Sequence, residues 1–261
     1  MTAGADSHAS FRVRLRAGER LVGTFLKTPS PIICEVLGLS PLDVVCIDAE
    51  HAPFDRLAID GCVAALRAAS RPSLVRVASQ APEHLLNALD CGATGVVVPH
   101  VADVTTVREI ARLTQYGRAG RGYAGSSRAA SYTTKTMATH LADSARDTTV
   151  IAQIEDFEAL DVIDDIAQAA VASGLDALFI GRADLAVALG ASSASDPVVL
   201  DAARRICAAG RSAGIAIGTF VPALTEVPQW IEQGVSLFLL ASDHAFLLQG
   251  AASLAANVRS A

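Results

Sequence analysis

The sequence predicts one (β/α)8 barrel, the TIM-barrel fold, on three observations. Short apolar runs rich in β-branched residues recur along the chain, segments rich in Ala and Leu lie between them, and 261 residues suit one such barrel. Near-continuous apolar strands that alternate with helices are buried on both faces, which is typical of a parallel sheet. We expect a disordered N-terminus over residues 1–10 and a single barrel domain over 11–261.

Each element can be placed from its local pattern. The expected strands cover residues 21–26, 43–48, 73–77, 95–99, 149–155, 176–181, 214–220 and 235–241. Apolar residues at helical spacing predict helices over 57–69 and 83–90. An open doubly wound sheet is the alternative, but the Gly-x-Gly-x-x-Gly loop expected after its first strand is absent from the sequence. The stretch 117–147 is expected to be a long irregular loop that serves as a lid or a subunit contact.

Composition excludes several classes of protein. Hydrophobic residues make up 51% and charged residues 18%, which favours a globular chain over a disordered one. A net charge of −6 without a Lys/Arg-rich run argues against nucleic-acid binding. No apolar stretch approaches the ~18 residues that a membrane helix needs, and residues 1–10 do not resemble a signal peptide. Five cysteines without a Cys-x-x-Cys pair indicate a reducing compartment, so we expect a cytoplasmic protein.

Polar residues collect where the predicted strands end. Catalytic groups of such barrels lie at the C-terminal ends of the strands, so this pattern predicts the active-site face. The residues concerned are Asp48, Glu50 and His51 after the second strand, Arg76 in the third, Gln153 and Glu155 in the fifth, and Arg182, Ala183 and Asp184 after the sixth.

Glu155 and Asp184 follow adjacent strands and could point at one spot. Two carboxylates that leave open positions for water and substrate suit Mg²⁺ or Mn²⁺. The alternative is that both carboxylates cap the free N–H groups of helices. Zinc has no support, because neither His-x-x-x-His nor Cys-x-x-Cys occurs.

The basic residues leave a choice between catalysis and structure. His51 is a candidate general base, or a structural histidine in a loop. Arg76, in an apolar strand, should meet a carboxylate or an anionic ligand, since a buried guanidinium without a partner is costly. Lys27 and Lys135 are the only lysines, and neither lies inside a predicted strand, which disfavours Schiff-base chemistry.

An ordered set of motifs resembles the HpcH/HpaI family of class II pyruvate aldolases from about residue 18 to 245. The motifs are IDAEHAPFD (47–55), LVRV (74–77), LDCGATGVVVPHV (89–101), GRAGRGYAG (117–125), AQIED (152–156) and FIGRADLAVALG (179–190). The resemblance implies a (β/α)8 barrel that assembles as a homo-oligomer, often a hexamer, with a helix exchanged between partners.

The resemblance also assigns the binding residues. Glu155 and Asp184 match the family's ligands of a divalent metal, Mg²⁺, Mn²⁺ or Co²⁺. Gln153, Asp184 and the backbone near Ala183 would hold the 2-keto acid.

Three further positions match catalytic residues of the family. His51 would act as acid and base together with a water, and Arg76 would stabilise the charge of the enolate. Asp90 matches the aspartate that tunes this histidine, whereas spacing alone would assign that task to Asp48.

The implied activity is that of a metal-dependent aldehyde-lyase. A metal-bound enolate of pyruvate or hydroxypyruvate would add reversibly to an aldehyde. Another enolate-forming lyase or a decarboxylase is an alternative, as is a non-catalytic keto-acid binding protein, which would not require His51. Arg182 stands where the family usually has proline and Phe25 where it often has tryptophan, so the identity of the substrate stays open.

Overall fold

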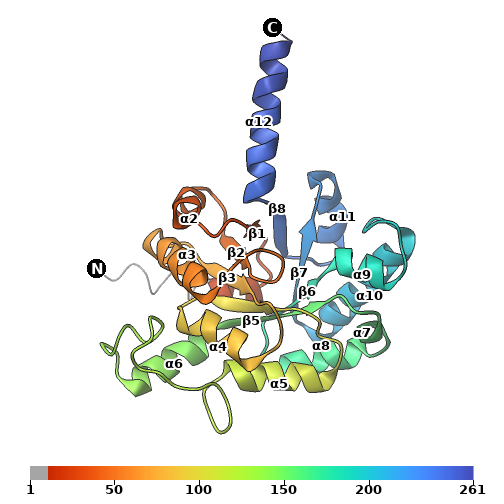
Figure 1. Cartoon of the computed structure of the whole chain (residues 1–261). Coiled ribbons are helices and arrows are strands. Elements are labelled where there is room, and N and C mark those ends of the chain that lie inside the picture. Colours follow the sequence, from red (N-terminus) through yellow and green to blue (C-terminus); the bar gives the residue numbers. More distant parts are fainter. Residues whose placement is uncertain (1–10, 261) are drawn as a thin grey trace.

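The computed structural model describes residues 11–260 and shows a closed parallel barrel surrounded by helices (Figure 1). The eight strands are hydrogen-bonded in chain order, and β1 pairs with both β2 and β8. The barrel thereby pairs every one of these strands on both sides. The predicted (β/α)8 barrel is confirmed, and the open sheet is excluded. The N-terminus predicted to be disordered, residues 1–10, lies outside the described residues.

Every predicted strand overlaps an observed one. The strands are β1 (Leu21–Leu26), β2 (Val44–Asp48), β3 (Ser73–Arg76), β4 (Gly95–Val98), β5 (Thr149–Ile154), β6 (Ala177–Ile180), β7 (Ala216–Val221) and β8 (Leu237–Ser242). The helices are α2 (Pro31–Gly38), α3 (Arg56–Ala68), α4 (Pro82–Asp90), α5 (Val104–Thr114), α6 (Met137–Asp147), α7 (Phe157–Asp161), α8 (Ile163–Ala172), α9 (Arg182–Ala188), α10 (Pro197–Ala213), α11 (Val227–Glu232) and α12 (Asp243–Arg259), with a 3-10 turn, η1 (Leu224–Glu226).

The core has two layers because strand side chains alternate between the two faces of the barrel wall. One layer fills the barrel interior and includes Phe25, Cys46 and Phe179, with Phe11 and Leu15 of the preceding helical turn packed against it. The larger layer lies between the strands and the surrounding helices. This double burial explains why the strands read as continuous apolar runs.

The segment 117–147 is only partly irregular, so its prediction as one long loop was wrong. Its last part, Met137–Asp147, forms α6, and the side chain of Thr136 caps this helix by accepting a hydrogen bond from the Thr139 N–H. His140 is the residue of α6 that is buried. Because so little of the helix is covered, the usual apolar stripe is missing from the sequence.

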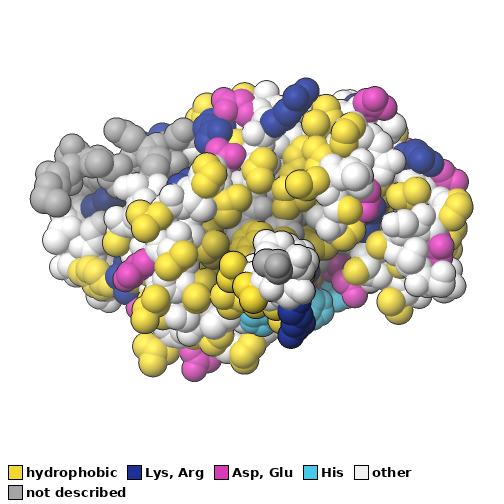
Figure 2. Space-filling model, turned by 90° about the horizontal axis from the view of Figure 1, so that it is seen from above, with side chains coloured by type: hydrophobic (Ala, Val, Ile, Leu, Met, Phe, Trp, Pro, Cys, Tyr) yellow, Lys and Arg dark blue, Asp and Glu magenta, His cyan; other side chains and the backbone are white. Residues whose placement is uncertain are grey.

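Helix α12 projects away from the barrel at the end where the strands finish (Figure 1). Asp243 is its buried residue, and this carboxylate accepts hydrogen bonds from the backbone N–H groups of Lys27 and Thr28 at 2.7 and 3.0 Å. Beyond that anchor the helix exposes Phe246, Leu247 and other apolar side chains. Figure 2 looks down on this face with α12 end-on and hydrophobic side chains around it. Among the described residues, no helix combines the length and apolar character needed to cross a membrane.

Candidate active site

A cavity of about 440 Å³ opens at the C-terminal ends of the strands. It is where the strand-end rule places catalytic groups in this fold. The apolar side chains of Phe25, Phe179, Phe220 and Pro222 line it together with the predicted residues His51, Arg76 and Asp184 and with Lys27, which was not predicted.

Arg76 lies at the wall of this cavity with its charge balanced by carboxylates. Its Nη2 is 2.9 Å from Asp48 Oδ1, and its guanidinium carbon is 4.6 Å from the centre of the Phe25 ring. Asp48 is fully buried and also binds Lys27 Nζ at 2.7 Å. The predicted partner of Arg76 is therefore a carboxylate. Lys27 lines the cavity too, although its ammonium group is held by Asp48.

Glu50 and His51 form the turn that follows β2. The backbone N–H of His51 donates to Asp48 Oδ1 at 3.1 Å, which fixes the turn, and half of the His51 side chain is exposed to solvent. Glu50 Oε2 lies 3.7 Å from His51 Nε2 and 3.3 Å from Arg76 Nε. Burial raises the pKa of Glu50, and the positive charges of Arg76 and His100 offset part of that effect.

Glu155 follows β5 and is buried at 1% exposure. Its carboxylate accepts hydrogen bonds from Gln153 Nε2 and, at 3.0 Å, from the backbone N–H of His100. Burial raises the pKa of Glu155, and these two hydrogen bonds oppose the shift. Gly181 leaves room for the group, since a Cβ there would lie 2.3 Å from Glu155 Oε2. These partners are not helix N-terminal N–H groups, so the alternative reading of Glu155 as a helix cap is wrong.

Asp184 lies in the first turn of α9 and lines the cavity, as does its neighbour Ala183. Burial is the largest cause that raises the pKa of Glu50, and the negative charge of Asp184 raises it further. Within the described part of the chain, no hydrogen bond or ion pair holds the Asp184 carboxylate. It is free to bind a ligand in the cavity.

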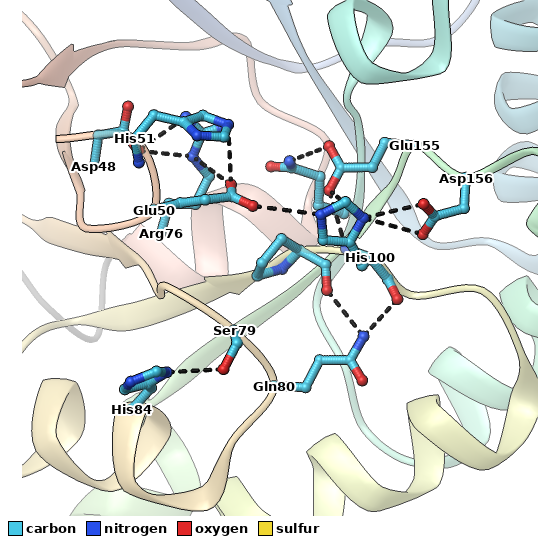
Figure 3. Close-up of polar contacts among 12 residues, drawn as sticks. Asp48, Glu50, His51, Arg76, Ser79, Gln80, His84, His100, Glu155 and Asp156 are labelled. Atoms are coloured by element: carbon cyan, nitrogen blue, oxygen red, sulfur yellow. Dashed lines mark hydrogen bonds and ion pairs between the residues drawn. The ribbon is translucent and has the colours of Figure 1, made fainter. Parts of the chain in front are cut away.

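His100 completes the site, and the sequence reasoning did not assign it a role. It follows β4 and Pro99, and its Nδ1 lies 3.0 Å from Asp156 Oδ1 (Figure 3). Burial lowers its pKa, but the carboxylates of Asp156 and Glu155 outweigh this, so the pKa is raised. The strand-end rule, which placed Glu50 on this face, could have found His100 as well, because His100 follows β4.

The surroundings of Glu155 fit a divalent cation. Glu50, His100 and Glu155 offer ligand atoms that all lie within 4.8 Å of one another. The buried atoms Glu50 Oε2 and Gln153 Oε1 have no hydrogen-bond partner in the described part of the chain. The buried Gln153 Oε1 is costly unless a cation or a ligand compensates it, whereas the ion pair with Arg76 Nε at 3.3 Å compensates part of the cost at Glu50 Oε2. This group differs from the predicted pair, since it contains Glu155 but not Asp184.

Asp90 is not brought to His51 within the chain. It is the last residue of α4, which returns the chain from the C-terminal end of β3 to the start of β4 at the opposite end of the barrel. There it forms an ion pair with the buried guanidinium of Arg121. A role of Asp90 at His51 remains a prediction that would need a second copy of the chain.

The fold and the site together define a class of protein, the metal-dependent lyases that break or form a bond next to a carbonyl group. A closed barrel presents a half-exposed histidine, an arginine held by carboxylates and a group of metal-competent side chains at its strand ends.

The chain belongs to the HpcH/HpaI aldolase/citrate lyase family, whose pattern it matches over residues 21–249. It is 31% identical over 247 residues to the 5-keto-4-deoxy-D-glucarate aldolase of Salmonella arizonae, a match that covers 94% of each chain. A crystal structure of an HpcH/HpaI aldolase/citrate lyase family protein from Burkholderia cenocepacia superposes with a TM-score of 0.89 at 33% identity, covering 96% of this chain and 99% of that one. An HpcH/HpaI aldolase from Desulfitobacterium hafniense gives a TM-score of 0.87 at 28% identity, covering 95% and 96%. The predicted family is confirmed, and at the family level the activity is that of a class II aldolase.

Proposed function

We propose that this protein cleaves and forms 4-hydroxy-2-keto acids, with pyruvate or hydroxypyruvate as the keto-acid partner and an aldehyde as the other. The observation that carries the proposal is the convergence of His51, Arg76 and Asp184 on one cavity, with Glu155 buried beside Gly181 at its wall. A proton acceptor, a fixed positive charge and carboxylates that can hold a cation are what metal-assisted enolate chemistry requires.

Glu155 and Asp184 would hold a divalent ion, Mg²⁺, Mn²⁺ or Co²⁺. When bound, such an ion polarises a carbonyl group and makes the neighbouring C–H more acidic. Gln153 and the backbone near Ala183 would orient the keto acid. Gln153 suits this task because its Oε1 is buried without a hydrogen-bond partner in the described part of the chain.

Arg76 would stabilise the negative charge of the reaction, and His51 would transfer the proton. Arg76, fixed by Asp48 and Glu50, would stabilise the negative charge that develops on the keto oxygen. His51, half-exposed at the cavity, would accept the proton from C3 during synthesis, or from the C4 hydroxyl during cleavage. In cleavage, loss of that proton drives breakage of the C3–C4 bond and releases the aldehyde.

The substrate class is tested by a direct assay. The similarity to 5-keto-4-deoxy-D-glucarate aldolase supports an acidic, hydroxylated substrate. We expect release of pyruvate, or of a 3-hydroxylated relative, from a 4-hydroxy-2-keto acid. Carbon dioxide release instead would identify a decarboxylase, and binding without turnover would identify a keto-acid binding protein.

The metal is tested by chelation and by Glu155→Gln. Chelator-stripped enzyme should be inactive, and Mg²⁺, Mn²⁺ and Co²⁺ should each restore activity, since oxygen ligands discriminate weakly among these ions. Glu155→Gln keeps the size but loses the charge, so more metal should be needed for half-maximal activity. Glu158→Gln removes an exposed carboxylate three residues further on and is the matched control. Metal curves that coincide in all three proteins would refute the assignment.

We also propose a homo-oligomer, expected as a hexamer, in which α12 packs on a neighbouring copy. The exposed apolar side chains of this projecting helix support the proposal, since such a surface is costly in water. A neighbour could also bring its Asp90 toward His51. Light scattering should give a mass above that of a dimer, and Leu254→Asp should lower it. An active monomer would refute the assembly.

A cytoplasmic location is proposed on the state of the cysteines. All five are free and buried, which suits a compartment that keeps thiols reduced.

A further inference from the structure

The backbone of His100 is held in an unusual conformation at the edge of the metal site. Its φ of +57° lies in the left-handed region, which few residues other than glycine adopt. Two side chains keep it there. Glu155 Oε1 accepts from its N–H at 3.0 Å, and Gln80 Nε2 donates to the carbonyl oxygens of Pro99 and His100 (Figure 3). Strain of this kind is concentrated at functional sites.

The imidazole of His100 lies among three carboxylates: its Nδ1 is near Asp156 and, at 3.7 Å, Glu155 Oε1, and its Nε2 is near Glu50. Nδ1 lies 3.0 and 3.3 Å from the two carboxylate oxygens of Asp156, and Nε2 points to Glu50 Oε1 at 3.6 Å. A histidine that binds a metal nearly always donates its second ring N–H to an outer acceptor, which is a carboxylate, a backbone carbonyl or a water. Ligand bonds of about 2.1 Å separate neighbouring ligand atoms by about 3 Å. A small closure would therefore let Nε2 and Glu50 Oε1 share one ion.

We propose, on the basis of the proposed metal-dependent function, that His100 Nε2 is a direct ligand of the divalent ion and that Asp156 positions it. A second observation supports a ligand at this place. Gln153 is fully buried beside Glu155, and its Oε1 lacks a hydrogen-bond partner in the described part of the chain. The nitrogen ligand adds tighter binding of Mn²⁺ and Co²⁺ than of Mg²⁺ to a site whose oxygen ligands alone discriminate weakly, so all three ions still restore activity.

The test is the electron-spin-echo modulation of Mn²⁺ bound to the full-length enzyme. Wild type should show ¹⁴N modulation from a coordinated imidazole. Enzyme made with ¹⁵N-labelled histidine should show ¹⁵N modulation in its place. His100→Asn should abolish it, and Asn suits the backbone because it also tolerates positive φ. His51→Asn should keep the modulation, although His51 Nε2 is only 3.7 Å from Glu50. His84→Asn is the matched control, because its Nδ1 is bonded to Ser79 and faces away from the metal site (Figure 3).

Affinity provides the second measurement. Asp156→Asn should raise the Mn²⁺ dissociation constant about 10- to 100-fold, the usual effect of losing an outer carboxylate, and His100→Asn at least as much. Mn²⁺ bound to wild type without nitrogen modulation, or modulation that survives in His100→Asn, would overturn this inference alone. Failure of wild type to bind Mn²⁺ would overturn the proposed metal site, and this inference with it.

Discussion

Asp48 and Arg76 are cross-strand neighbours at the catalytic end of the barrel. They are the last residues of β2 and β3, they pair in register, and Arg76 Nη2 lies 2.9 Å from Asp48 Oδ1. Asp48 is itself held from the other side by Lys27. Asp48 therefore positions the guanidinium so that its remaining N–H groups can face the cavity.

Arg76→Lys should separate charge from geometry. Lysine keeps the positive charge but lacks the planar fork, so it cannot contact Asp48 and Glu50 together. We expect kcat for aldol cleavage to fall about 10²- to 10³-fold, the effect of losing one preorganised donor. Steady-state kinetics measure it, with Arg204→Lys at an exposed ion pair as the control. An unchanged kcat would mean that Arg76 acts only as a structural ion pair.

His51→Ala should lose activity without losing metal. General acid–base groups contribute about 10²- to 10⁴-fold to rate, and we expect a decrease of that size in kcat. Mn²⁺ affinity should stay at the wild-type value, because His51 is not one of the proposed ligands. Turnover near that of wild type would assign His51 a structural role.

The sequence was sufficient for the barrel but not for every helix. Strands buried on both faces produce short, nearly continuous apolar runs, so all eight could be placed. Helix α6 could not, because His140 is its one buried residue and its start depends on the capping side chain of Thr136.

The positions of the site residues could be predicted from the strand ends, but the contacts between separate loops could not. The strand-end rule predicts that Arg76 and Glu155 lie on the catalytic face, and both do. The approach of His100 to Glu155 and Asp156 depends on how the loops after β4 and β5 sit against each other, which residue spacing does not report. Asp90 was assigned from resemblance, and the return of α4 places it far from His51 in the same chain.

Arg182→Met should reduce stability. The side chain of Arg182 is buried: Nη1 is 2.7 Å from Glu226 Oε2 and the guanidinium carbon is 4.9 Å from the centre of the Trp230 ring. Losing these contacts should lower the free energy of unfolding by roughly 1–3 kcal/mol.

Urea unfolding of Arg182→Met, Glu226→Gln and the double variant tests the pair. The double variant should lose less stability than the sum of the single variants, since they share one interaction. Strict additivity would show that the contact with Glu226 contributes nothing.

Asp48→Asn should change how stability depends on pH. Burial would raise the pKa of Asp48, but the positive charges of Arg76 and Lys27 outweigh it, so the pKa lies below the ordinary 3.8. A lowered folded-state pKa contributes stability above the unfolded value and loses it as pH falls through the folded value. Wild type should therefore have a higher Tm than Asp48→Asn at about pH 7. This difference in Tm should shrink as the pH falls below 3.8. Asp201→Asn, at an exposed ion pair, should show little difference at either pH. A gap between wild type and Asp48→Asn that stays constant on acidification would show that the charge of Asp48 does not stabilise the fold.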